Sequence, residues 1–264
     1  VSMFRMLAIS RTFWLEMLRR KDLYVLLILL VTLLFILMSL NIFGLGGMVR
    51  YVTDLGFTLA WLFSWILGIN FAARQLPQEE ARGTIYPLLA KPLGRGQLIL
   101  GKWLGAWSAT AVATIVFYLL IVLIIRLRGG TVVPEPLFQA LLLHLAAVGI
   151  VTAMAIAVST RMTYGAAATM SYVIAISSFI IVPQTPHMIV NEQGFTRTAL
   201  FAVYYALPHF ELFDMRQRVV HEWGAVPGPV LGGIILYGLV WIGILLTLAW
   251  MGYRKKTFKR GYLG

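Results

Sequence analysis

The sequence contains no cysteine, and charged residues are scarce in it. The absence of cysteine excludes disulfides, thiolate metal sites, iron–sulfur clusters and a cysteine nucleophile. Charged residues make up 12% of the 264 residues, about half of their usual share of roughly 25%, whereas 60% of the residues are hydrophobic. A water-soluble domain of this size needs more polar surface than this composition supplies. The composition therefore predicts an integral membrane protein.

Long apolar stretches give the expected architecture. A helix needs about 20 apolar residues to cross the hydrocarbon core of a bilayer. Six stretches meet this length approximately, at residues 23–40, 52–73, 103–125, 137–158, 164–182 and 230–252. None of them alternates as a barrel strand would, and none contains a proline. We expect an all-α polytopic membrane protein with six transmembrane helices, forming a single transmembrane domain over residues 1–264.

The basic residues predict the orientation of these spans. With six spans, both termini lie on one side of the membrane. That side holds 16 of the 22 Lys and Arg residues and the other side holds six. Because basic loops favour the cytoplasm, both termini are expected to be cytoplasmic. The net charge of +12 then follows from topology and from contact with anionic lipid, so no nucleic-acid partner is needed to explain it.

Three segments outside the spans have distinct patterns. Residues 1–22 contain an amphipathic run at 3–17, which predicts an interfacial helix or, alternatively, a simple orientation anchor. Residues 74–102 form a predicted cytoplasmic loop, in which 78–82 could make a short helix that ends near Gly83. Residues 183–229 form a predicted extracytoplasmic loop, in which we expect two short helices, broken at Pro208 and packed on the outer mouth.

Catalytic and metal-binding patterns are incomplete. The run from Gly96 to Lys102 is close to a nucleotide-binding P-loop, but Trp103 stands where that motif needs a hydroxyl for magnesium. His209 and Glu211 have the spacing of a zinc deaminase motif, whose other half requires cysteine. His144 lies inside the fourth span, either as a functional group or as a histidine that is hydrogen-bonded to a neighbouring helix.

The energy source for any transport is expected to lie outside the membrane. No Asp or Glu occupies the middle of any apolar stretch, although ion-coupled transporters commonly place carboxylates there. Spans interrupted by mid-span Gly or Pro pairs, which are typical of many secondary transporters, are not evident either. If the chain moves a substrate, we expect the driving free energy to come from a partner protein.

The predicted cytoplasmic loop resembles that of a known transporter family. It reads Glu79-Glu80-Ala81-Arg82-Gly83-Thr84, followed by Leu88-Leu89-Ala90-Lys91-Pro92, Arg95 and Gly101-Lys102. This pattern, together with the six spans and the long last outer loop, resembles the ABC type-2 exporter permeases. The resemblance implies a permease subunit that exports a substrate by coupling to ATP hydrolysis in a separate ATPase, and it implies that the loop carries a coupling helix.

The resemblance also implies partners and sites. It implies two ATPase copies that hold ATP and magnesium, a second permease copy or a close relative, and a bacterial or archaeal cytoplasmic membrane. The chain itself would be no enzyme and would bind no cofactor. The residues expected to contact the ATPase are Glu79, Glu80, Arg82, Gly83, Thr84 and Arg161. The polar residues expected to line a pathway are Asn41, Thr58, Ser64 and Asn70. A non-transporting membrane anchor or assembly subunit is the alternative.

Overall fold

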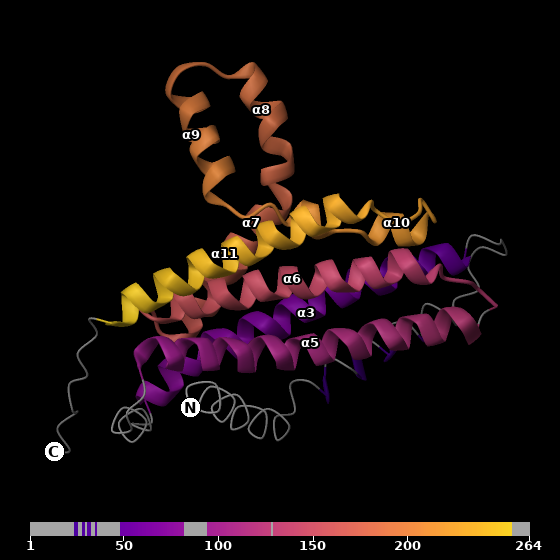
Figure 1. Ribbon diagram of the computed structural model, residues 1–264, viewed down its shortest axis with the longest axis horizontal. Coiled ribbons are helices and arrows are strands. Elements are labelled where there is room, and N and C mark those ends of the chain that lie inside the picture. Colours follow the sequence, from indigo (N-terminus) through magenta and orange to yellow (C-terminus); the bar gives the residue numbers. More distant parts are fainter. Residues whose placement is uncertain are drawn as a thin grey trace.

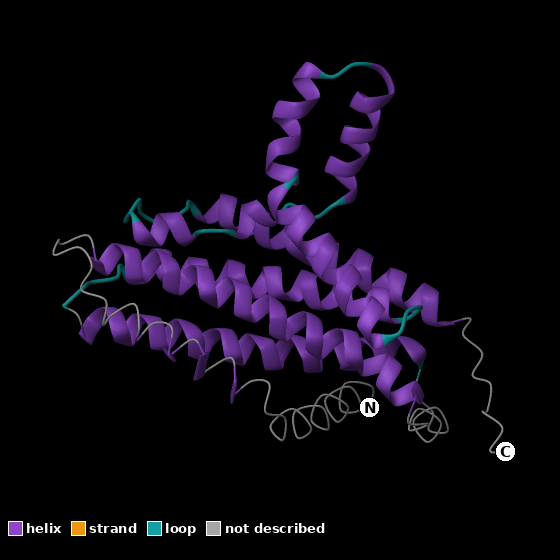
Figure 2. Ribbon diagram, turned by 180° about the vertical axis from the view of Figure 1, so that it is seen from behind, coloured by secondary structure: helices purple, strands orange, loops and turns teal. Residues whose placement is uncertain are grey.

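The protein is a bundle of long helices with a smaller helical hairpin at its side (Figures 1 and 2). The computed structural model describes residues 48–81, 94–127 and 129–254, together with residues 24, 25, 28, 29, 31, 32 and 35. The long helices are α3 (Met48–Ala81), α5 (Arg95–Leu127), α6 (Pro134–Ser159), α7 (Tyr164–Ile180) and α11 (Gly228–Arg254). The short elements are η1 (Val182–Gln184), α8 (Thr185–Asn191), α9 (Gly194–Ala206), η2 (Phe210–Phe213) and α10 (Arg216–Val220).

Five segments of the described chain are long and apolar enough to cross a membrane. They are Arg50–Ala81, Arg95–Leu127, Pro134–Ser159, Tyr164–Val190 and Gly228–Arg254. These segments confirm the all-helical prediction and coincide with five of the six predicted spans. The remaining predicted span, 23–40, and the predicted interfacial helix, 1–22, lie largely or wholly outside the described residues. Large apolar side chains are exposed along the outer faces, such as Leu119 on α5 and Leu236 on α11, as expected where lipid replaces water.

The predicted cytoplasmic loop 74–102 is shorter in the structure, because helices extend into both of its ends. Helix α3 continues through Pro77 to Ala81, so Glu79 and Glu80 lie on its last turns and not on a separate short helix. Packing outweighs the local signals here, since Leu76 is fully buried and Gln75 bonds to α5. Gly94 caps the start of α5, where its N–H donates to the Gln97 side chain at 3.3 Å as in a capping box. Residues 82–93 lie outside the described part.

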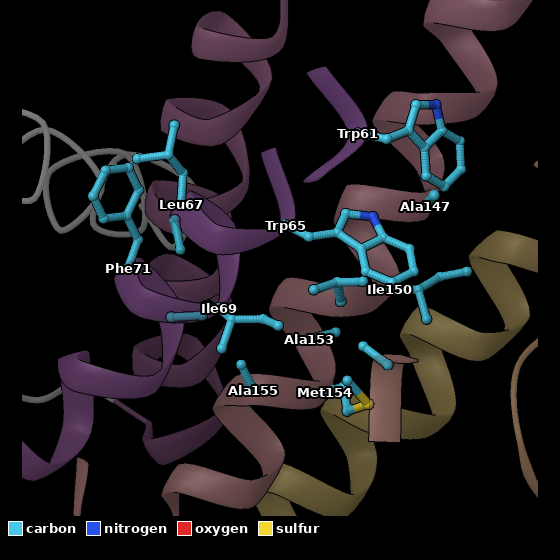
Figure 3. Packing of buried hydrophobic residues seen from close by; sticks show 14 of the residues in the cluster. Trp61, Trp65, Leu67, Ile69, Phe71, Ala147, Ile150, Ala153, Met154 and Ala155 are labelled. Atoms are coloured by element: carbon cyan, nitrogen blue, oxygen red, sulfur yellow. The ribbon is translucent and has the colours of Figure 1, made fainter. Parts of the chain in front are cut away.

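Helix α6 is the centre of the bundle and packs against α3, α5, α7 and α11. Small residues on α6 allow this close approach, and Figure 3 shows Ala147 of α6 beside the Trp61 indole of α3 and Ala155 of α6 beside Ile69 of α3. Gly149 is the tightest of these positions. A Cβ placed there would lie 2.9 Å from Ile242 Cδ1 on α11 and 3.4 Å from Trp107 Nε1 on α5.

A β-branched side chain at Gly149 is therefore expected to separate α6 from α11. Gly149→Val should lower the stability of the purified protein by about 1–3 kcal/mol, which is typical of overpacking, and a thermal unfolding scan in detergent measures it. Gly243→Val is the matched control, because a Cβ at Gly243 on α11 meets no atom within 4 Å. Equal melting temperatures for the two variants would contradict the close approach at Gly149.

The predicted extracytoplasmic segment 183–229 contains short helices and one projecting hairpin. Helices α8 and α9 stand away from the bundle as an antiparallel pair (Figure 1). Gly194 opens α9 with a φ of +63°, a left-handed conformation that glycine adopts without steric cost. Helix α9 ends at Ala206, just before Pro208. The chain beyond Pro208 forms only η2 and α10 rather than one longer helix.

The two ends of the bundle differ in their charged groups. At one end lie the last turns of α3 and α11, the first turn of α5 and the turn between α6 and α7, with Lys102, Arg95, Arg161 and Arg254. We call this the basic end. At the other end lie η2, α10 and the turn between α5 and α6, and we call this the loop end.

Candidate functional site

An ion pair at the loop end attaches α10 to the bundle. The Arg216 guanidinium donates from Nε and Nη2 to the two carboxylate oxygens of Asp214, at 2.8 and 2.7 Å. Its Nη1 donates to Thr58 Oγ1 on α3 at 2.8 Å. Burial lowers the pKa of Arg216, but the hydrogen bonds and charge of Asp214 outweigh that effect and raise the pKa above its ordinary value. The guanidinium therefore stays charged and holds η2 and α10 against α3.

Arg216 also contacts the aromatic interior of the bundle. Its guanidinium carbon lies 5.6 Å from the ring centre of Trp61 and 5.7 Å from that of Phe179. Both distances are within the range of a cation–π interaction. The Trp61 indole in turn stacks on the His144 imidazole, with ring centres 4.5 Å apart and planes inclined by 14°. A continuous set of contacts thus leads from the charged loop end to His144 in α6.

His144 is fully buried, and both of its ring nitrogens have hydrogen-bond partners. Nε2 lies 2.7 Å from Ser64 Oγ on α3, and Nδ1 lies 3.2 Å from the Tyr118 hydroxyl on α5. Ser64 Oγ donates to the Trp61 carbonyl at 2.9 Å, so it accepts from Nε2. This pattern fits a neutral imidazole with its proton on Nε2. Of the two possibilities left open by the sequence, His144 matches the one in which it is bonded to neighbouring helices.

Farther along α3, a second polar group joins this helix to α7. Asn70 Nδ2 donates to the Tyr172 hydroxyl at 2.9 Å, and the Tyr164 hydroxyl donates to Asn70 Oδ1 at 3.0 Å. Arg74 Nη2 also donates to the Tyr164 hydroxyl, at 3.2 Å. These bonds fix the position of α7 relative to α3 between the loop end and the basic end.

At the basic end, an ion pair between Lys102 and Glu79 joins the start of α5 to the last turns of α3. The side chain of Lys102 is only 8% exposed and that of Glu79 is 22% exposed. Gln75 Nε2 donates to the Lys102 carbonyl at 3.1 Å, which adds a second bond between the same two helices. The two helix ends on either side of residues 82–93 are therefore fixed to each other.

Arg95 joins the end of α11 to this group. Its Nη1 donates to the carbonyls of Tyr253 and Arg254, at 2.9 and 2.6 Å. These carbonyls belong to the last described turn of α11, and Arg95 bonds them in the manner of a side-chain cap. The first two turns of α5 thus hold both the end of α3, through Lys102, and the end of α11, through Arg95.

Comparison with known proteins gives the family. Residues 8–256 match the family model described as ABC-2 family transporter protein. The chain belongs to the ABC-2 transporter family. Membership, together with the five apolar helices, makes it an integral membrane protein and a transmembrane subunit of an ABC transporter.

One curated relative supports the same assignment for this ABC-2 chain. Over 100 residues it is 35% identical to a Pseudomonas aeruginosa protein named "Probable ABC transporter permease protein NosY". The matched region covers 34% of this chain and 36% of the relative. The chain thus spans about a third of the length of the curated relative that it matches.

The predicted contact residues of this ABC-2 subunit fall into two groups. Glu79, Glu80 and Arg161 are described, and they lie at the basic end: the first two on α3 and the third in the turn between α6 and α7. Glu79 is bound to Lys102 within the chain, whereas Arg161 is exposed. Arg82, Gly83 and Thr84 lie outside the described residues. Their contact with an ATPase remains a prediction.

The predicted pathway residues belong to three separate sets of bonds. Thr58 bonds to Arg216 of α10, Ser64 to His144 of α6, and Asn70 to two tyrosines of α7. The fourth, Asn41, lies outside the described residues. All three described side chains thus connect α3 to other elements of the same chain, and a role in lining a pathway remains a prediction.

Several residues of these groups were not selected from the sequence. Lys102 was noted only as part of a Gly-Lys pair, and nothing in the sequence marked Glu79 as its partner across 23 positions. Tyr118 lies in an apolar span, and nothing in the sequence distinguished it from its neighbours there. Asp214 and Arg216 carried a usable signal, because opposite charges two residues apart lie between the buried apolar residues Phe213, Met215 and Val219 of the outer segment.

Among the described residues, no group of three or more His, Asp or Glu side chains is placed to hold a metal ion. The His144 group contains one histidine and no carboxylate among its hydrogen-bond partners. The groups found in the described helices attach helices to one another.

Proposed function

We propose that this ABC-2 family chain is the permease subunit of an ATP-driven exporter, in which a separate ATPase supplies the free energy. The observation that carries the proposal is the family match over residues 8–256. The described spans support it, because they contain polar hydrogen-bonded groups but none of the mid-span carboxylates that ion-coupled transporters use. The name of the NosY relative points to the same role.

The proposed assembly has two ATPase copies and two permease copies, the second permease being identical or a close relative. ATP and magnesium are bound by the ATPases. The basic end faces the cytoplasm of a bacterial or archaeal cell, in keeping with the positive-inside rule. Both termini lie on that side, and the projecting hairpin and the loop end belong to the outer half of the molecule.

The basic end is suited to receive the movement of an ATPase. In the proposed mechanism, residues 82–93 carry the coupling helix, with Arg82, Gly83 and Thr84 as contacts beside Glu80, and Arg161 forms a second, smaller contact. The Lys102–Glu79 pair makes α3 and α5 move together, and the bonds of Arg95 include α11 in the same movement. Since the packed helices resist deformation, a displacement at this end is passed to the loop end.

The test is co-purification with the ATPase and measurement of its ATP turnover. The double variant Glu79→Lys, Glu80→Lys should remain in the membrane but lose stoichiometric ATPase, and the single variant Arg82→Glu should weaken binding without disturbing the Lys102–Glu79 pair. Glu192→Lys is the control, because Glu192 is exposed in the hairpin far from the basic end. Wild-type ATPase binding by both test variants would overturn the coupling assignment. An intact protein that never co-purifies with an ATPase would favour the anchor or assembly subunit.

A further inference from the structure

A groove of about 490 Å³ opens between α6, α7 and α11 beneath the end of α9. Its walls are apolar and include Met154 of α6, Ile174 of α7, and Trp241 and Leu245 of α11. The end of α9 and the residues after it, Ala206, Leu207 and Pro208, form the wall of the groove on the side of the hairpin. The volume is within the range of roughly 300–1,000 Å³ that small-molecule sites in proteins occupy, and such sites are mostly apolar with few polar groups.

The polar part of this groove is at the basic end. Thr160 and Arg161, in the turn between α6 and α7, complete its lining. The Thr160 hydroxyl donates to the Ala157 carbonyl at 2.7 Å. Arg161 is exposed. Its backbone N–H donates to the Val158 carbonyl at 3.2 Å, but within the described part of the chain its guanidinium has no hydrogen bond or ion pair. Its situation differs from that of Lys102, which binds Glu79, and of Arg95, which binds two carbonyls.

The depth of the groove corresponds to one leaflet of a bilayer. Trp241 lies 13 residues before Arg254, the last residue of α11. At about 1.5 Å per residue, Trp241 is roughly 20 Å from the basic end, and Leu248 is roughly 9 Å from it. Half of a hydrocarbon core is about 15 Å thick. The apolar walls therefore lie at the depth of lipid tails, and Arg161 lies near the level of lipid headgroups.

We propose that this groove binds an anionic phospholipid of the leaflet beside the basic end. One acyl chain lies along Ile174, Trp241 and Leu245, and the phosphate is bound by the Arg161 guanidinium. The charge supports this occupant, because an exposed guanidinium that has no partner among the described residues offers paired N–H donors to phosphate oxygens. Basic pockets between transmembrane helices are known to suit such headgroups. The site depends on the chain spanning a membrane, and because Arg161 is also the smaller contact in the proposed ATPase interface, lipid binding is tested on the chain without its ATPase.

Lipid titration monitored by native mass spectrometry tests the proposal on the purified full chain without its ATPase. Phosphatidylglycerol and phosphatidylcholine with identical acyl chains are compared. We expect the wild type to bind phosphatidylglycerol about fivefold more tightly, as one basic residue near a membrane surface predicts. Arg161→Gln should abolish the preference. Leu245→Trp, which fills the groove, should weaken the binding of both lipids.

Arg254→Gln is the matched control, because Arg254 is an exposed arginine at the same end that stands over Trp250 and does not line the groove. Unchanged preference in Arg161→Gln, or an equal loss in Arg254→Gln, would overturn the proposal in favour of general attraction of lipid to the basic end. Dissociation of a dimer by Leu245→Trp, with lipid binding unchanged, would also overturn it, since the groove would then hold a second copy. Loss of ATPase binding in Arg82→Glu with lipid binding intact separates this site from the coupling site.

Discussion

Replacing Lys102 with glutamate is expected to separate the start of α5 from the end of α3. The substitution places a second carboxylate next to Glu79, at a position where the lysine side chain is only 8% exposed. Removing one partner of a fully buried ion pair costs about 3–5 kcal/mol. Because Glu79 is partly exposed, we expect a loss near the lower end, on the order of 3 kcal/mol. Thermal unfolding of the purified protein in detergent measures this loss.

The exchanged pair Glu79→Lys, Lys102→Glu should recover a substantial part of the lost stability, since it restores opposite charges at the same positions. Arg254→Glu is the control for the change in net charge and for its effect on membrane insertion. It should cost about 1 kcal/mol or less, the value of an exposed cation–π contact with Trp250. If the exchanged pair is no more stable than Lys102→Glu alone, then the two residues do not act as an ion pair.

Removing the carboxylate of Asp214 is expected to release α10 from the bundle at the loop end. Asp214→Ala removes the carboxylate that accepts three hydrogen bonds from Arg216. Two are donated by the guanidinium and one by the backbone N–H, at 3.0 Å. Arginine cannot give up its proton at neutral pH, so a charged side chain that is 16% exposed loses its hydrogen-bonded carboxylate, and the weaker effect of Asp54 is left. We expect a loss on the order of 3 kcal/mol, measured as a lower melting temperature.

A second variant separates the ion pair from the fold of the loop. Asp214→Ala combined with Arg216→Leu removes both charges and should be more stable than Asp214→Ala alone, since no unpaired cation remains. Arg216→Leu alone should also lower the stability, because Thr58 loses its donor and Trp61 loses a cation–π contact. A melting temperature of Asp214→Ala equal to that of the wild type would contradict the anchoring role of this ion pair.

The spans were predictable from the sequence because the free energy of membrane insertion is a sum over the residues of each span. Each apolar residue contributes to the transfer free energy independently, so a continuous stretch of about 20 residues is informative by itself. The helix ends were less predictable. The segment around Pro77 suggested a loop, yet α3 continues to Ala81 because Leu76 and Gln75 pack on α5. The end of α3 depends on the contact of Gln75 with Lys102, 27 positions away, and the helix propensity of the local sequence carries no information about that contact.

The hydrogen-bonded and ion-paired groups were even harder to predict from the sequence. His144 was recognised as exceptional, because an ionisable residue in a span is rare, but its partners Ser64 and Tyr118 come from two other helices. The same holds for Glu79, which the family resemblance marked as a partner contact and which the fold places against Lys102. One sequence shows which residues are unusual. The way in which the helices pack in three dimensions determines which of these residues contact one another.

The bonds that join α3 to α5, the Lys102–Glu79 ion pair and the Gln75 hydrogen bond, affect the entropy of closing the segment between these helices. Bringing the two ends of a flexible segment together has an entropic cost that grows as about (3/2)RT times the logarithm of its length. Between Ala81 and Gly94 this cost is already met by folding, through the Lys102–Glu79 pair and the Gln75 bond. A partner that binds residues 82–93 therefore binds a segment whose two flanking helix ends are already held together. Replacing Lys102, which is not among the expected contact residues, would remove the ion pair and weaken that partner's affinity without altering any residue that it is expected to touch.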